Sequence, residues 1–169
     1  MVVTLSNRRI SFCTCLFYAI QYHSTLPRRR LRSHEIPWCS LVEERDIEFT
    51  NWLYAEERHG IWNGKEVDIF MAWDTSYAPY LDKTMAAYKL LSGRGLDHLA
   101  YPAVGHVVRN GTADICGIMT QPAYGRMVEY TDKSLVYKAI SQIERGGLLF
   151  TGIKLSNIMV TDDGQVRLL

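Results

Sequence analysis

The fold is decided by residues 134–169, SLVYKAISQIERGGLLFTGIKLSNIMVTDDGQVRLL, where helical periodicity gives way to the pattern of a hairpin. Apolar residues recur at helical spacing over 134–145, Asp132 is placed to cap this helix, and Gly146-Gly147 is placed to end it. Asp163-Gly164 separates two short apolar runs, which predicts a tight turn between antiparallel strands. The apolar stripe of the predicted helix consists of Leu135, Val136, Ala139, Ile140 and Ile143.

Upstream of this stretch, two further turn dipeptides predict two more hairpins. Asn63-Gly64 and Asn110-Gly111 each lie between strand-like runs and tolerate the positive φ angles of a hairpin turn. A helix is predicted over Tyr80 to Leu91, whereas Leu41 to Glu56 is ambiguous between helix and strand. The resulting order, with helices between hairpins, predicts an α+β fold.

Composition limits the kind of protein this can be. The 169 residues are 47% hydrophobic, which suits one ordinary core. Lysine and arginine (19) nearly balance aspartate and glutamate (18), so the formal charge of +1 gives no reason to expect a nucleic-acid partner. The four cysteines do not have the spacing of a zinc site or a disulfide framework. Oligomeric state stays open.

Residues 1–34 differ from the rest because they are arginine-rich and carry no acidic side chain before Glu35. Their apolar run, Ile10 to Ile20, is too short to span a bilayer but has the layout of a targeting segment. Two interpretations stay open: a disordered leader, or mitochondrial or secretory targeting. A cytoplasmic or nuclear location is favoured, and no transmembrane span is expected.

The segment 145–160, RGGLLFTGIKLSNIMV, resembles the catalytic loop of protein kinases. The match lies in the spacing of Ile153, Lys154 and Asn157 and in the apolar strand that follows them. The resemblance implies a protein-kinase-like small lobe, an antiparallel sheet plus one helix, with only the start of the helical large lobe.

The remaining elements are assigned by the same resemblance. It implies a small-lobe-like region over 35–119, then a hinge and a truncated large-lobe start with a catalytic-loop remnant over 120–169. Val67 to Trp73 would be the third strand of the small lobe. Thr120, Gln121 and Ala123 are the hinge candidates.

Several groups that phosphoryl transfer needs are missing by this alignment. Gly152 stands at the position of the catalytic aspartate and has no side chain to position a hydroxyl. Phe70 stands where the phosphate-pairing lysine is expected, and Thr84 stands where its glutamate partner is expected. The glycine-rich loop is also missing, since Gly60 is the single glycine between Leu41 and Trp62. The chain is therefore expected to lack phosphotransferase activity.

Two residues of the catalytic-loop remnant keep the family's identity. In protein kinases the residue at Lys154 contacts the transferred phosphate, and the one at Asn157 holds magnesium. A single amide is a weak magnesium ligand, so no cofactor is expected and Asn157 is predicted to bond within its own loop. The alternative is an ATP-binding kinase or phosphotransferase with an atypical or incomplete active site, which would use ATP and magnesium.

The sequence also suggests a partner surface and two histidines without a ligand role. A kinase-like large lobe without its later helices would leave the stripe of helix 134–145 partly exposed, so this helix is the expected contact for a protein partner. His98 and His106 are predicted to be surface histidines or histidines with satisfied ring nitrogens.

Overall fold

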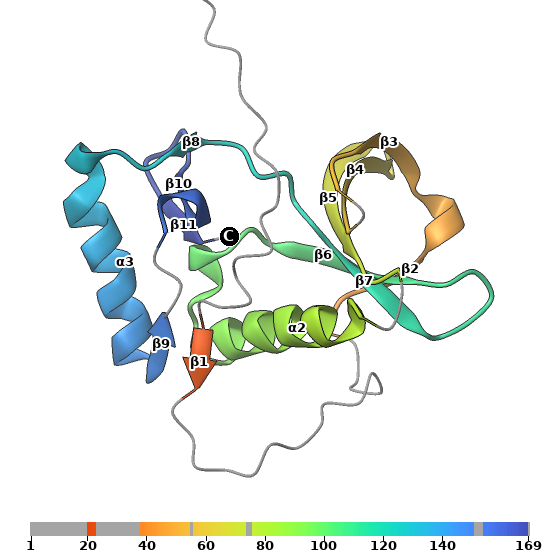
Figure 1. Ribbon diagram of the computed structural model, residues 1–169, viewed down its shortest axis with the longest axis horizontal. Helices are drawn as coiled ribbons and strands as arrows, with labels where there is room; N and C mark the ends of the chain where they lie inside the picture. Colours follow the sequence, from red (N-terminus) through yellow and green to blue (C-terminus); the bar gives the residue numbers. More distant parts are fainter. Residues whose placement is uncertain (1–19, 23–37, 55, 74–75, 151–153, 169) are drawn as a thin grey trace, which may run out of the picture.

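The structure is a computed structural model that describes residues 20–22, 38–54, 56–73, 76–150 and 154–168. It is an α+β fold in which a six-stranded sheet, two long helices and two small sheets pack together (Figure 1). The predicted fold class is therefore confirmed at this level.

The strands and helices have the following bounds. The strands are β1 Ile20–Tyr22, β2 Leu41–Glu43, β3 Glu48–Trp52, β4 Glu57–Trp62, β5 Lys65–Met71, β6 Ala103–Val108, β7 Ile115–Thr120, β8 Arg126–Met127, β9 Leu148–Phe150, β10 Ile158–Val160 and β11 Val166–Leu168. The helices are α2 Ala78–Gly93 and α3 Lys133–Arg145, with short 3₁₀ turns η1 Glu44–Asp46, η2 Asp97–Leu99, η3 Tyr130–Asp132 and η4 Leu155–Asn157.

The large sheet has the order β2-β6-β7-β5-β4-β3, and β2 lies parallel to β6 while all its other pairs are antiparallel. The sheet is thus mixed, not purely antiparallel as expected. Strands β2 and β6 are far apart in the chain, so no tight turn imposes an antiparallel direction on them. The ambiguous segment 41–56 forms β2, η1 and β3.

The predicted turns follow their glycine chemistry, with one difference. Asn63 and Gly64 have φ angles of 50° and 71° and form the two-residue turn between β4 and β5. The second hairpin has a longer loop over 109–114, in which Gly111 has a φ of 73°. Its Asn110-Gly111 pair turns the chain inside that loop, where the Thr112 N–H donates to the Arg109 carbonyl at 3.0 Å. Gly164, with a φ of 75°, turns the chain between β10 and β11.

Both predicted helices form, but the expected cap of the second does not. Helix α2 is longer than predicted at both ends, and α3 begins one residue earlier, at Lys133. The Asp132 carboxylate does not cap α3: it accepts hydrogen bonds from the Arg126 guanidinium at 2.6 and 2.8 Å and from the Glu129 N–H at 2.8 Å. A bidentate cation competes better for a carboxylate than a single helix amide does.

The core lies on both faces of the large sheet because successive strand residues point to opposite sides. Phe70 and Ile118 face α2 and belong to a cluster that continues through Leu91 to Ile143 of α3 and Leu168 of β11. The opposite face carries a second cluster: Val42, Ile47, Val67, Ile69, Met71, Val107, Cys116 and Met119. The sheet, α2, α3 and the strands β9, β10 and β11 therefore share one continuous core.

Two features complete the fold. Strand β1 pairs antiparallel with β9, so part of the arginine-rich range 1–34 adds a strand beside α3 (Figure 1). The rest of that range lies outside the described residues. The prediction of a disordered or targeting leader concerns those residues. None of the helices in the described part of the chain is long and apolar enough to cross a membrane.

Candidate functional site

The hinge candidates lie in the connector 120–124, which joins β7 to the chain that leads to α3. Thr120 and Ala123 are buried, whereas Gln121 is exposed. The Gln121 N–H donates to the Pro102 carbonyl at 2.9 Å, and the Tyr124 N–H to the Pro122 carbonyl at 3.0 Å. The Ala123 N–H donates to the Asp68 carboxylate at 2.8 Å, and proline has no N–H. Every backbone N–H over 121–124 is therefore already bonded within the chain.

Asp68 connects this connector to the sheet. Its side chain is almost fully buried on β5, and its Oδ1 lies 2.6 Å from Nδ1 of His59 on β4, which is also buried. Its Oδ2 is the acceptor of the Ala123 N–H. One carboxylate thus links two strands and the connector, because a buried carboxylate is stable when both oxygens have donors.

A second tether holds the other end of the connector. The Tyr101 hydroxyl donates to the Tyr124 carbonyl at 2.9 Å, and burial raises the pKa of Tyr101 to about 12, so the hydroxyl stays protonated. The Tyr124 hydroxyl in turn donates to the Glu66 carboxylate. Thr120 Oγ1 is buried without a hydrogen-bond partner in the described residues. The connector is fixed from both sides.

The segment 145–160, which the resemblance aligned with a catalytic loop, is described over 145–150 and 154–160. Gly152 lies outside the described residues. Asn157 is 2% exposed, and its Oδ1 accepts a hydrogen bond from the Ser156 hydroxyl at 2.9 Å, which agrees with the prediction that it bonds within its loop. Lys154 is exposed, and its carbonyl accepts the Asn157 N–H at 3.0 Å. The remnant is a 3₁₀ turn that orders the start of β10.

The two residues aligned with the family's ion pair lie in the interior. Phe70 is 3% exposed and belongs to the cluster beneath α2. Thr84 is equally buried on α2, and its hydroxyl donates to the Tyr80 carbonyl at 3.2 Å. Gly60 lies within β4, where a Cβ would stand 3.0 Å from the Glu48 carbonyl oxygen. Close strand packing explains this glycine.

An apolar groove of about 690 Å³ opens beside Lys154, and we call it the α3 groove. Its lining comes from η3 and the two residues before it, from α3, from η4 and the residue before it, and from β10: Val128, Glu129, Tyr130, Lys133, Val136, Tyr137, Ile140, Lys154, Leu155 and Ile158. Tyr130, Tyr137 and Leu155 are 87%, 59% and 70% exposed, so large apolar side chains stand around it in solvent. Nζ of Lys133 lies 6.0 Å from the Tyr130 ring centre and 5.6 Å from that of Tyr137.

The ion pair between Arg126 and Asp132 holds the turn η3, which precedes α3 and lines part of the α3 groove. The Arg126 guanidinium and the Glu129 N–H both donate to Asp132, and these bonds lower the pKa of its carboxyl to about 2. Asp132 therefore stays ionised through the physiological range. This fixes the turn that presents Tyr130 and the first residue of α3, Lys133.

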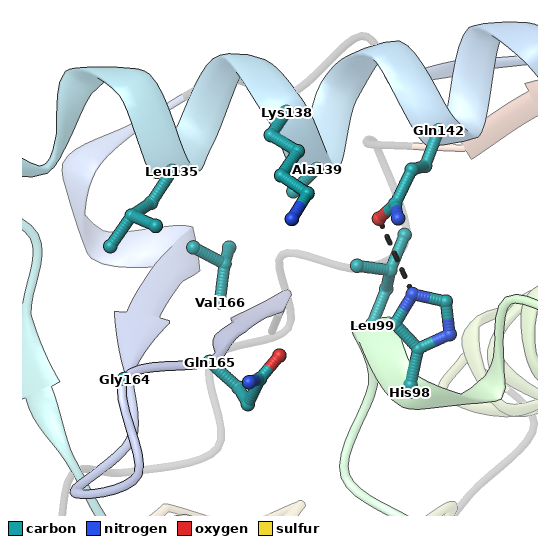
Figure 2. A pocket seen from close by; sticks show the side chains of 9 residues that line it. All are labelled: His98, Leu99, Leu135, Lys138, Ala139, Gln142, Gly164, Gln165 and Val166. Carbon is teal, nitrogen blue, oxygen red and sulfur yellow. Dashed lines mark hydrogen bonds between the residues drawn. The ribbon is translucent and has the colours of Figure 1, made fainter.

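A smaller hollow of about 120 Å³ lies between α3, η2 and the β10–β11 hairpin, and we call it the hairpin hollow. Lys138 and Gln142 reach into it from α3, while His98 and Gln165 lie on the other side (Figure 2). Nε2 of His98 lies 3.3 Å from Oε1 of Gln142. The rest of its lining is Leu99, Leu135, Ala139, Gly164 and Val166.

Sequence reasoning missed two buried polar arrangements. Asp68 interrupts the apolar strand Val67 to Met71, and a lone acid in a buried strand is a signal for a fixed partner. Arg58 is 2% exposed, and its guanidinium carbon lies 3.6 Å from the ring centres of both Trp52 and Trp73. Only the fold brings these two tryptophans together.

The prediction for His106 was wrong. Its side chain is fully buried, neither ring nitrogen has a hydrogen-bond partner among the described residues, and Trp38 packs edge-on against it at 4.3 Å. Burial lowers its pKa, so the ring is neutral. His98, by contrast, is exposed and bonded to Gln142.

Among the described residues, no three His, Cys, Asp or Glu side chains come together in a way that could hold a metal ion. No protein-family model matches the chain, and no curated protein matches it either.

Proposed function

We propose that this chain is a protein-kinase-like domain without phosphotransferase activity that acts through protein contacts. The order of elements supports the family: after β1 and β2, strands β3, β4 and β5, helix α2, and strands β6 and β7 precede the connector, helix α3, the turn η4 and the β10–β11 hairpin. The strand order β6-β7-β5-β4-β3 supports it too: of the two strands after α2, the second, β7, pairs with β5, and the first, β6, pairs with β7 on its far side. This is the sequence of elements that the catalytic-loop resemblance implies.

The connector carries the argument for inactivity. A nucleotide base that bound along 121–124 would need backbone N–H groups free to donate, and each of these N–H groups already has an acceptor in the chain. A ligand at Ala123 would have to displace a buried carboxylate. Phe70 and Thr84 supply no charge for phosphate groups, and the β3–β4 connection at 53–56 has no glycine.

The α3 groove supports action through a protein partner. Its floor is apolar, exposed tyrosines stand at its edge, and aromatic side chains of this kind contribute strongly to protein interfaces. The charged residues of its lining are Lys133, Lys154 and Glu129, a net positive set. The matching partner is an amphipathic helix that places apolar side chains in the groove and acidic side chains beside the two lysines. Two copies of this chain would instead bring like charges together.

Nucleotide binding tests the first half of the proposal. The full chain is melted with and without ATP and magnesium at millimolar concentration, and no change in Tm is expected. A rise of several degrees would show binding to the folded state. It would favour the alternative, an atypical phosphotransferase that uses Lys154 and Asn157. Phosphate transfer abolished by Asn157→Ala would contradict the proposal directly.

Site-specific crosslinking in cells tests the second half. A photo-reactive amino acid replaces Tyr137 in the groove, and a matched control replaces Ser92, an exposed residue of α2. We expect a discrete crosslinked protein from position 137 that is absent from position 92 and is lost when Lys133 is changed to Glu. Crosslinking to a second copy of the chain, or equal products from both positions, would refute this use of the groove.

A further inference from the structure

The hairpin hollow has the composition of an anion site. Its polar lining consists of His98, Lys138, Gln142 and Gln165, and no acidic side chain is among its lining residues. Lys138 has neither an ion pair nor a hydrogen bond within the described residues, in contrast to Arg126, which is paired with Asp132. A lysine beside a concave surface without a counter-ion attracts an anion from solution.

The polar side chains of the hairpin hollow lie around one space. Figure 2 shows the Lys138 amine and the Gln142 amide directed down from α3, with Gln165 below them and His98 at the side. The contact between His98 Nε2 and Gln142 Oε1, at 3.3 Å, uses the carbonyl oxygen of Gln142. This leaves the amide NH₂ of Gln142 to donate elsewhere. The Lys138 ammonium and the Gln142 amide thus lie above the hollow, and Gln165 lies below them with its carbonyl oxygen toward it (Figure 2). Rotation of this exposed amide turns its NH₂ group to the same space.

We infer that the hairpin hollow binds a small carboxylate. One permanent cation, Lys138, matches the single negative charge of a carboxylate, and the glutamine NH₂ groups can donate to its two oxygens. The volume of about 120 Å³ holds roughly four waters, which is the size of acetate or a slightly longer acid. Leu99, Leu135 and Val166 supply apolar wall for the carbon end.

Phosphate fits this lining less well. At neutral pH it carries between one and two negative charges, and the hollow holds one permanent positive charge. Because the hollow is open and small, the carboxylate binds weakly, with a Kd in the millimolar range. The inference does not depend on the kinase-like assignment, because it uses only the geometry of α3, η2 and the hairpin.

The test is an NMR titration of the ¹⁵N-labelled full chain with sodium acetate, against sodium chloride at equal ionic strength. We expect saturable shifts of the side-chain amide signals of Gln142 and Gln165 with acetate and none with chloride. Lys138→Met should weaken acetate binding at least about tenfold, because a charge-assisted hydrogen bond is lost. Lys133→Met, the same charge change on the same helix but in the α3 groove, should leave the titration unchanged.

Three results would overturn the inference. They are shifts of equal size with chloride, binding that survives Lys138→Met, and tighter binding of inorganic phosphate than of acetate. Since Lys138 is exposed, its replacement should leave the Tm unchanged, which the same samples report. Gln165→Ala, on the hairpin, is the second variant and should also weaken acetate binding.

Discussion

Replacement of Asp68 with alanine is the most informative perturbation of this fold. The change removes the shared acceptor of the His59 ring and the Ala123 N–H, which lie 2.6 and 2.8 Å from its two oxygens. Both donors are buried, so water cannot replace the lost bonds. The connector would lose its link to the sheet.

The magnitude follows from these two contacts. A buried donor left without an acceptor costs about 1–3 kcal/mol, and Asp68→Ala leaves two such groups, the His59 ring and the Ala123 N–H. We expect Asp68→Ala to lower the free energy of unfolding by about 3–5 kcal/mol. Asp68→Asn keeps one carbonyl oxygen in place and should lose less, about 1–3 kcal/mol.

Urea unfolding followed by tryptophan fluorescence measures the effect. With an m-value of about 2 kcal/mol/M, the alanine variant should unfold at a midpoint about 1.5–2.5 M lower than the parent. A double-mutant cycle with His59→Ala separates the histidine contact from the connector contact. A shift below about 0.5 kcal/mol for Asp68→Ala, or equal losses for alanine and asparagine, would refute this account of the carboxylate.

Three further predictions concern glycine packing and pH. Gly117→Ala should lower the free energy of unfolding by several kcal/mol, because its Cβ would lie 2.7 Å from a backbone oxygen of β5. Gly93→Ala, whose Cβ would have nothing within 4 Å, should be neutral or stabilising in the same urea assay. Burial lowers the pKa of His106, so its contribution to stability is present above about pH 6.5 and is lost as pH falls. The free energy of unfolding should fall by at most about 1.4 kcal/mol per pH unit between pH 7 and 5. This slope should be smaller in His106→Leu. The pKa of Asp132, lowered to about 2 by Arg126, gives stability that is present above about pH 4 and is lost toward pH 2, and Asp132→Asn should remove this part of the acid unfolding curve.

Local chemistry explains which elements could be predicted. Helix 134–145 and the turns at Asn63-Gly64 and Asp163-Gly164 depend on neighbours within a few residues, so periodicity and glycine placement were enough. The segment 41–56 could not be assigned, because β3 pairs with its neighbour β4 with a register shift between Phe49 and Asn51, and β2 pairs with the distant β6. Strand pairing over such distances has no local signature.

At the candidate site, too, the sequence indicated residues that lie close together in the chain but not those whose partners lie on other elements. Lys154 and Asn157 could be proposed from the sequence because they lie in one short stretch, and the bond of Asn157 to Ser156 is local as well. The roles of Asp68 and Arg58 were not found, since their partners lie on other elements. His106 was wrong for the same reason, because its burial depends on Trp38 and the sheet around it.

By itself, then, the sequence determined the α+β class, two helices and three turns, because each depends on residues close together in the chain. Only the tertiary structure decided that the connector amides are already bonded, that two hollows lie along α3, and that Phe70 belongs to the core. These features arise where separate elements meet, and burial there decides which polar groups find partners.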